Sequence, residues 1–152
     1  MDKYELESRT KKFAVDVIRF VRGFERSTPG RVIGHQLLKS ATSIGANYRE
    51  ANRAGSRRDF SYKIIIIEKE ASESSYWLEI CLESSLGSRD SCSELLEESR
   101  ELLAIFTAIG RSLRTNDNRS TRDPDFGVAE TEPLEYRSGV YDTQITDLVP
   151  TE

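Results

Sequence analysis

The chain has few of the residues on which catalytic sites depend. Among 152 residues it contains one histidine, His35, and two cysteines, Cys81 and Cys92. A lone histidine on a helix is more often a structural or surface residue than a base, and neither cysteine has a neighbour that would activate it as a nucleophile. No Glu has a His three residues on, as a di-metal site in a helix bundle requires. We therefore predict no catalytic residues, no metal, no cofactor and no enzymatic activity.

Long hydrophobic runs are also missing. The densest apolar segment is Ile64–Ile67, far short of the roughly 20 residues that a membrane span needs. The first residues, MDKYELESRTKK, are charged and lack the apolar stretch of a signal peptide. Two cysteines do not make a disulfide framework in a chain of this size. These absences predict a cytoplasmic protein without membrane association.

The net charge of −4 hides an uneven distribution of charged residues along the chain. Residues 1–63 carry 14 Lys and Arg against 7 Asp and Glu, residues 64–115 carry 5 against 10, and residues 116–152 carry 3 against 9. The basic first part suits a polyanion. Pairing with the acidic remainder, between helices or between subunits, explains the same distribution.

Apolar residues recur every three or four positions in four segments, which predicts four helices. The helices are expected over about 3–24, 29–54, 57–86 and 91–113. Thr28 is the expected N-cap of the second helix and Gly55 its expected end. Capping boxes at Ser56–Asp59 and Ser91–Glu94 mark the next two starts. The run Ile64–Ile67 is compatible with a strand, but the residues on both sides keep the helical period, so we predict helix.

From Asn116 onward the helical period disappears. Pro124, Pro133 and Pro150 stand among scattered acids, a composition typical of disorder. We therefore predict a four-helix domain over 1–115 and an acidic, largely disordered tail over 116–152. Apolar residues interspersed with the acids suit a segment that orders on a partner. The tail is expected either to fold back over the basic half or to bind a separate protein.

Two motifs in the middle of the chain resemble those of a known family. QLLKSATSIGANYREANRAGSRRDFSYKI, followed by EKEASESSYWLEI, is similar to the bacterial four-helix-bundle proteins of the 23S rRNA intervening-sequence family, over roughly residues 10–114. The resemblance implies an up-down antiparallel four-helix bundle that assembles into a ring, usually a pentamer. It also implies an unsettled activity, with nucleic-acid association the usual suspicion. Tyr48-Arg49 departs from the Ile-Ala pair that is common in the family.

A polar network and a basic set are the candidate sites. The network is expected to fix helix register and subunit contact, and a ligand site is the alternative. Its members are Ser40, Ser43, Asn47 and Glu50 on one helical face, and Glu70, Glu73 and Ser74 on the next helix. The basic set suits phosphate contacts, while a solvated or ion-paired face explains the same residues. Its members are Arg49, Arg53, Arg57 and Arg58, with Lys11, Lys12, Arg19, Arg22 and Arg26 adding basic character to the first helix.

These observations together predict an all-α oligomeric binding protein, with RNA or DNA as the leading ligand. The alternative is a structural or adaptor scaffold that holds a protein partner and does not bind nucleic acid.

Overall fold

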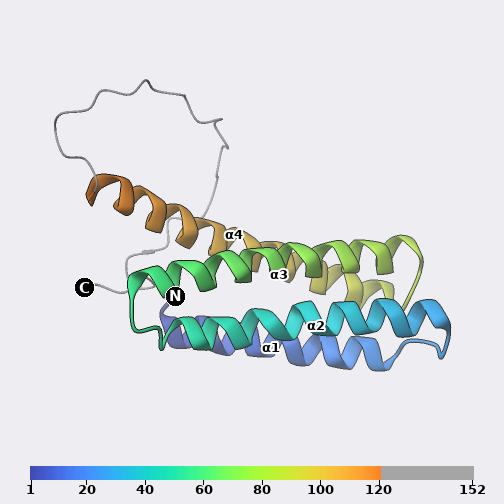
Figure 1. Ribbon diagram of the computed structural model, residues 1–152. Helices are drawn as coiled ribbons and strands as arrows, with labels where there is room; N and C mark the ends of the chain where they lie inside the picture. The colour runs from blue at the N-terminus through green and yellow to red at the C-terminus, as the bar shows by residue number, and fades with distance from the viewer. Residues whose placement is uncertain (121–152) are drawn as a thin grey trace, which may run out of the picture.

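A computed structural model describes the backbone of residues 1–120 and the side chains of residues 1–115. Within this range all regular structure is helical. The helices are α1 (Lys3–Arg22), α2 (Thr28–Ala51), α3 (Arg57–Glu83) and α4 (Arg89–Ser120). They run alternately up and down, and the connections between them are short (Figure 1). The predicted all-α up-down bundle is confirmed.

The helix boundaries depend on capping side chains, and they differ from the sequence predictions at several ends. Ser27, one residue before the predicted cap, accepts a hydrogen bond from the Gly30 amide and starts α2. Ser56 caps α3 as predicted. At the start of α4 the cap is Ser88 rather than the predicted Ser91. The Ser88 hydroxyl accepts a hydrogen bond of 3.5 Å from the Ser91 amide. Helix α2 ends at Ala51, before Gly55, and the amide of its C-cap Asn52 donates a hydrogen bond of 3.0 Å to the Tyr48 carbonyl.

The fourth helix continues beyond its predicted end at about Leu113. Helix α4 runs to Ser120, so Asn116–Ser120 are helical rather than the start of the tail. No apolar period is needed there, because the backbone hydrogen bonds of a helix continue until a residue breaks them, and the next proline is Pro124. The remaining tail, residues 121–152, lies outside the described residues.

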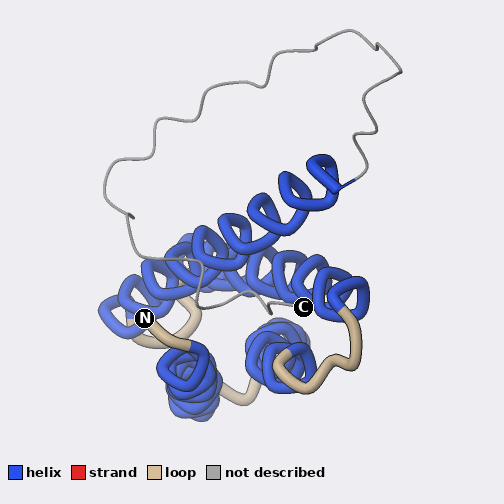
Figure 2. The backbone as a smooth tube through the Cα atoms, turned by 90° about the vertical axis from the view of Figure 1, so that its left-hand side faces the viewer, coloured by secondary structure: helices blue, strands red, loops and turns tan. Residues whose placement is uncertain are grey.

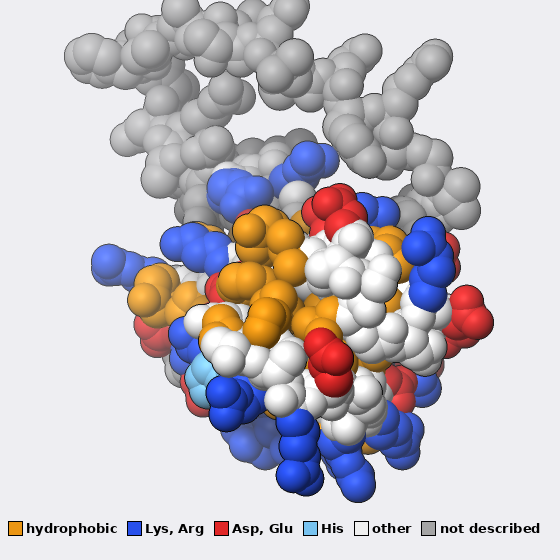
Figure 3. All heavy atoms as spheres, turned by 90° about the vertical axis from the view of Figure 1, so that its right-hand side faces the viewer, with side chains coloured by type: hydrophobic (Ala, Val, Ile, Leu, Met, Phe, Trp, Pro, Cys, Tyr) orange, Lys and Arg blue, Asp and Glu red, His pale blue; other side chains and the backbone are white. Residues whose placement is uncertain are grey.

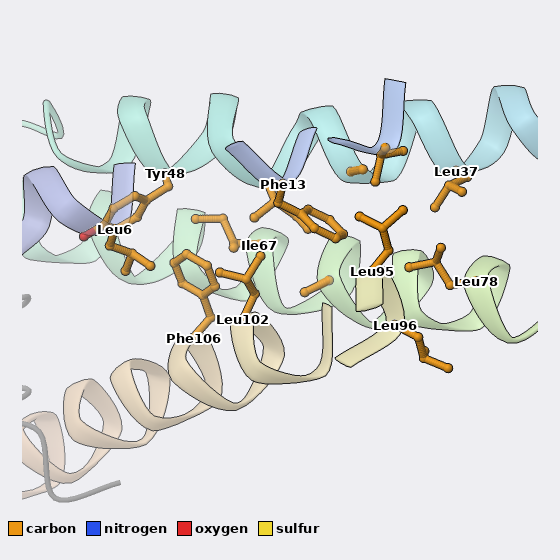
Figure 4. Packing of buried hydrophobic residues seen from close by; sticks show 14 of the residues in the cluster. Leu6, Phe13, Leu37, Tyr48, Ile67, Leu78, Leu95, Leu96, Leu102 and Phe106 are labelled. Atoms are coloured by element: carbon orange, nitrogen blue, oxygen red, sulfur yellow. The ribbon is translucent and has the colours of Figure 1, made fainter. Parts of the chain in front are cut away.

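The core is a continuous row of apolar side chains between the four helices. Figure 4 shows Tyr48 of α2 and Phe106 of α4 lying together with Leu6 of α1 at one end of this row. The two aromatic rings pack edge to face, with centroids 5.3 Å apart. Within Ile64–Ile67 the two outer residues are fully buried and Ile65 is 41% exposed, so this run follows the helical period and is not a strand.

Small residues let α1 approach α2 closely. A Cβ on Gly34 would lie 2.9 Å from the Val21 side chain, and one on Gly45 would lie 3.4 Å from the Thr10 hydroxyl. Close packing therefore explains Gly45 inside a helix, as the sequence predicted. By contrast, α4 contacts α1 least of the neighbouring helices. It crosses the bundle obliquely, and its C-terminal part rises away from α1 and α2 (Figure 2).

Candidate nucleic-acid interface

The four candidate arginines lie at the end of the bundle where α2 passes into α3. Arg49 is in the last turn of α2, Arg53 is in the connection, and Arg57 and Arg58 open α3. Because the helices alternate in direction, the N-terminus of α1 and the C-terminal part of α4 lie at this same end (Figure 1). The fold therefore brings the four arginines to the same end as the start of α1 and the C-terminal part of α4. Sequence spacing alone does not predict these neighbours.

The four side chains nevertheless face different neighbours. The Arg49 guanidinium is 3.9 Å from the Glu7 carboxylate of α1, and half of its side chain is exposed. The Arg57 guanidinium lies 3.5 Å from the Leu113 carbonyl of α4. Arg53 and Arg58 are exposed. Arg57 and Arg58 also border a shallow hollow with Tyr62.

The predicted polar network divides into separate groups. Ser74 of α3 donates a hydrogen bond of 2.9 Å to Ser40 of α2, and both side chains are fully buried. Ser40 in turn donates to the Leu37 carbonyl at 3.2 Å. This pair joins α2 to α3 through satisfied buried hydroxyls, which favours the structural reading for this part of the network.

A second group is more exposed. Lys63 of α3 lies 3.3 Å from the Asn47 side-chain oxygen and 2.5 Å from the Glu50 carboxylate, both on α2. Asn47 also donates to the Ser43 carbonyl at 2.9 Å. Glu50 is 62% exposed, so its ion pair with Lys63 contributes at most about 1 kcal/mol. That Asn47 and Glu50 set the helix register remains a prediction.

The last two predicted members, Glu70 and Glu73, lie on α3 and are half-buried. Glu73 accepts a hydrogen bond of 3.1 Å from the Trp77 indole of the same helix. One carboxylate oxygen of Glu70 is buried and has no hydrogen-bond partner among the described residues. Burial, together with the nearby Glu73 charge, raises the pKa of Glu70, while Lys39 opposes the shift. Glu70 is therefore adjacent to Glu73 but is not bound into a network with it.

Two further polar contacts were not predicted. The Ser75 and Ser99 hydroxyls lie 2.7 Å apart and join α3 to α4 inside the core. Ser99 stands between Leu95 and Leu102 at intervals of four and three, so the apolar stripe itself was a signal for its burial. Arg9 of α1 reaches across to α4, where it forms hydrogen bonds with the carboxylates of Glu98 and Glu101.

The residues with potential catalytic chemistry are dispersed. His35 is exposed on α2, whereas Cys81 and Cys92 are buried. Burial raises the pKa of Cys81 to about 12, which disfavours its nucleophilic thiolate. Within residues 1–115 no group of His, Cys, Asp and Glu side chains is placed to hold a metal ion. Nor is any helix of the described part long and apolar enough to cross a membrane.

Tyr48 is the clearest departure from an apolar core. It is fully buried, and its hydroxyl makes no hydrogen bond of good geometry among the described residues, although the Asn52 side chain is close enough to oppose the rise in its pKa. We expect Tyr48→Phe to raise the free energy of unfolding by about 1 kcal/mol at neutral pH, because it removes an unsatisfied buried hydroxyl without leaving a cavity. Urea denaturation measures this change. A loss of stability instead would show that the hydroxyl does have a partner.

At alkaline pH the free energy of unfolding is expected to fall in the wild type more than in Tyr48→Phe. Burial raises the pKa of Tyr48 from 10.0 to about 12. Because the pKa is higher in the folded state, the associated stability is complete below pH 10 and is lost as the pH rises through 12. The wild type should thus lose on the order of 2 to 3 kcal/mol that Tyr48→Phe keeps. Both proteins retain Cys81, so the difference between them isolates the tyrosine.

Comparisons with known proteins agree with this architecture. The model of the 23S rRNA-intervening sequence protein family matches residues 2–108, which confirms the resemblance seen in the sequence. A crystal structure from Bacteroides thetaiotaomicron, of a protein of unknown function from the S23 ribosomal protein family, is 34% identical with a TM-score of 0.64. The match covers 68% of this chain and 96% of that one. No curated protein matches the chain significantly.

Proposed function

The chain belongs to the 23S rRNA-intervening sequence protein family, and we propose that it is a cytoplasmic, non-enzymatic, oligomeric protein that binds the phosphates of nucleic acid. The observation that carries the proposal is the position of Arg49, Arg53, Arg57 and Arg58 at one end of the bundle. Arg53 and Arg58 are exposed there. Contacts of this kind supply affinity without reading sequence.

Assembly into a ring, which we propose to be a homopentamer, would multiply these arginines. Support for assembly comes from the outward face of α3, where Tyr62 is 63%, Ile65 41% and Tyr76 52% exposed. Trp77 lies next to Tyr76, and the two rings pack edge to face at 5.0 Å. Large apolar side chains gathered on one helix of a small bundle mark an interaction site. A second copy of the chain is the partner that we propose for it.

The test is a binding titration of labelled single-stranded and duplex RNA across a salt series. The purified wild type is compared with a variant in which Arg49, Arg53, Arg57 and Arg58 are all replaced by Ala. For a single strand each phosphate contact contributes about 0.7 to the slope of log affinity against log salt. Loss of up to four contacts per site therefore lowers the slope by up to about 3.

The matched control replaces the same four arginines by Lys, which keeps the charges. The Lys variant should retain most of the salt slope, because charge rather than guanidinium geometry sets counterion release. All proteins must first show the same mass in solution. Equal affinity and equal slope in the wild type and the Ala variant would contradict a role for these residues.

A scaffold for a protein partner is the alternative, with the C-terminal segment as the proposed point of contact. That segment, residues 121–152, lies outside the described residues, and it combines apolar residues with acids. If the wild type fails to bind RNA even at low salt, the nucleic-acid proposal is wrong. Retention of a specific protein by the full chain, and its loss on deletion of 121–152, would then support the scaffold.

A further inference from the structure

The solvent face of α2 carries a second set of basic residues, far from the four candidate arginines. Arg31, His35 and Lys39 are spaced by four, so they form one line along the helix. All three side chains are exposed. The spacing is visible in the sequence, but only the fold decides that this line faces solvent rather than α1 or α3. The line begins at the end of the bundle opposite the α2–α3 connection.

Lys11 of α1 lies beside the middle of this face. The exposed residues of α2 between Lys39 and Arg49 include Thr42 and Ala46, which carry no charge. Here Gly45 lets α1 approach so closely that a Cβ on it would lie 3.6 Å from the Lys11 backbone nitrogen. The Lys11 side chain is exposed. The Lys11 backbone thus lies beside the uncharged middle of α2, within reach of an exposed cationic side chain.

Few acidic side chains adjoin this surface. Glu7 of α1 is one of them, and its carboxylate lies 3.9 Å from the Arg49 guanidinium. Between residues 27 and 53 the only acid is Glu50, and Lys63 binds it at 2.5 Å. Arg31 has only a long hydrogen bond to Thr28, at 3.5 Å. Figure 3 views the end of the bundle where α2 begins. Lys and Arg side chains gather over its lower part, where α1 and α2 lie. Hydrophobic side chains gather above them, among uncharged and charged side chains.

We propose that the solvent face of α2 is a continuous track for the phosphodiester backbone of a nucleic acid, formed by Arg31, Lys39, Lys11, Arg49 and Arg53. We call these five residues the α2 track. The proposal rests on the proposed function and extends that site from one end of the bundle to the other. At 1.5 Å per residue, Arg31 and Arg49 are about 27 Å apart along the helix axis, a distance spanned by about eight phosphates of one duplex strand.

The shape of the track favours a nucleic acid over an acidic protein segment. A set of cations that extends along one helix suits a polymer whose charges recur at regular intervals. An acidic peptide needs apolar anchors in a pocket, and among the exposed large apolar residues of α2 there is only Val32. Binding of an acidic peptide with equal affinity would overturn this assignment.

The first test removes the far end of the track and leaves the four candidate arginines intact. The double variant Arg31→Ala/Lys39→Ala is titrated with a duplex RNA longer than the track and with a single strand, at several salt concentrations. If each cation neutralises one phosphate, the slope falls by about 1.4 for the single strand. Arg89→Ala/Arg100→Ala, which removes two exposed cations from α4, should leave the slope unchanged.

The second test asks whether the track is continuous. Ala46→Glu places an acid in the middle of the track, where α2 itself carries no charge, without removing any cation. We expect several-fold weaker binding, because the new carboxylate opposes a phosphate there. Ala104→Glu makes the same exchange at an exposed position of α4 and should have no effect. Both are exposed helical positions, where Glu costs only a few tenths of a kcal/mol relative to Ala.

The outcomes separate this inference from the proposed function. If the wild type binds no RNA at low salt, both proposals fail. If the wild type binds and loses affinity only in the variant lacking Arg49, Arg53, Arg57 and Arg58, the proposed function stands and the track is wrong. Loss of slope in Arg31→Ala/Lys39→Ala, with unchanged mass and with the α4 control intact, supports the track.

Discussion

Replacement of Phe106 by Ala is expected to lower the free energy of unfolding by about 3–5 kcal/mol. Phe106 is fully buried in α4, and its ring packs edge to face against Tyr48 of α2. Its removal costs the transfer free energy of the ring and leaves a cavity between two helices that belong to a close-packed core. Urea or thermal denaturation measures the loss.

The matched control for Phe106 is a residue of the same helix. Glu97 of α4 is exposed, and Glu97→Ala should change the free energy of unfolding by no more than about 0.5 kcal/mol. A loss below about 1 kcal/mol for Phe106→Ala would mean that the surrounding side chains collapse into the space. It would contradict tight packing at this end of the core.

The second large effect concerns assembly. Tyr62→Glu/Tyr76→Glu is expected to dissociate the oligomer, because each subunit would then bury two uncompensated carboxylates at the proposed α3 interface. Burial of an unpaired charge costs several kcal/mol, and the ring repeats this cost at every contact. Light scattering or native mass spectrometry of the purified proteins measures the change in mass.

Tyr4→Glu supplies the comparison for assembly. Tyr4 is 68% exposed on α1, so the same exchange there should leave the mass unchanged. If Tyr62→Glu/Tyr76→Glu keeps the mass of the wild type, α3 does not form the interface. If the wild type is itself a monomer, the proposed ring is wrong.

Much of the architecture followed from the sequence because it depends on local interactions. The three-to-four periodicity of apolar residues decided that Ile64–Ile67 belong to a helix, and Ser56 capped α3 where the sequence placed it. The end of α4 was harder to predict. A helix without an apolar face has no periodic signal, yet its backbone hydrogen bonds continue to Ser120.

The candidate site was predictable only in part. Spacing placed Arg49, Arg53 and Arg57 along one line, but the structure turns Arg49 toward Glu7 of α1 and Arg57 toward α4. The Ser40 and Ser74 hydroxyls met as one part of the expected network, whereas Glu50 remained at the surface. These differences arise because a residue's neighbours on other helices depend on rotation and crossing angle, which sequence spacing does not contain.

By itself, the sequence determined the number of helices, their approximate limits, the apolar stripe of each and the family. All of these depend on contacts within about four residues or on a motif read along one chain. The tertiary structure alone decided that Lys11 lies beside Gly45, and that Ser75 meets Ser99. Such neighbours are far apart in the chain, and the close approach of helices at Gly34 and Gly45, together with the oblique course of α4, sets which of them meet.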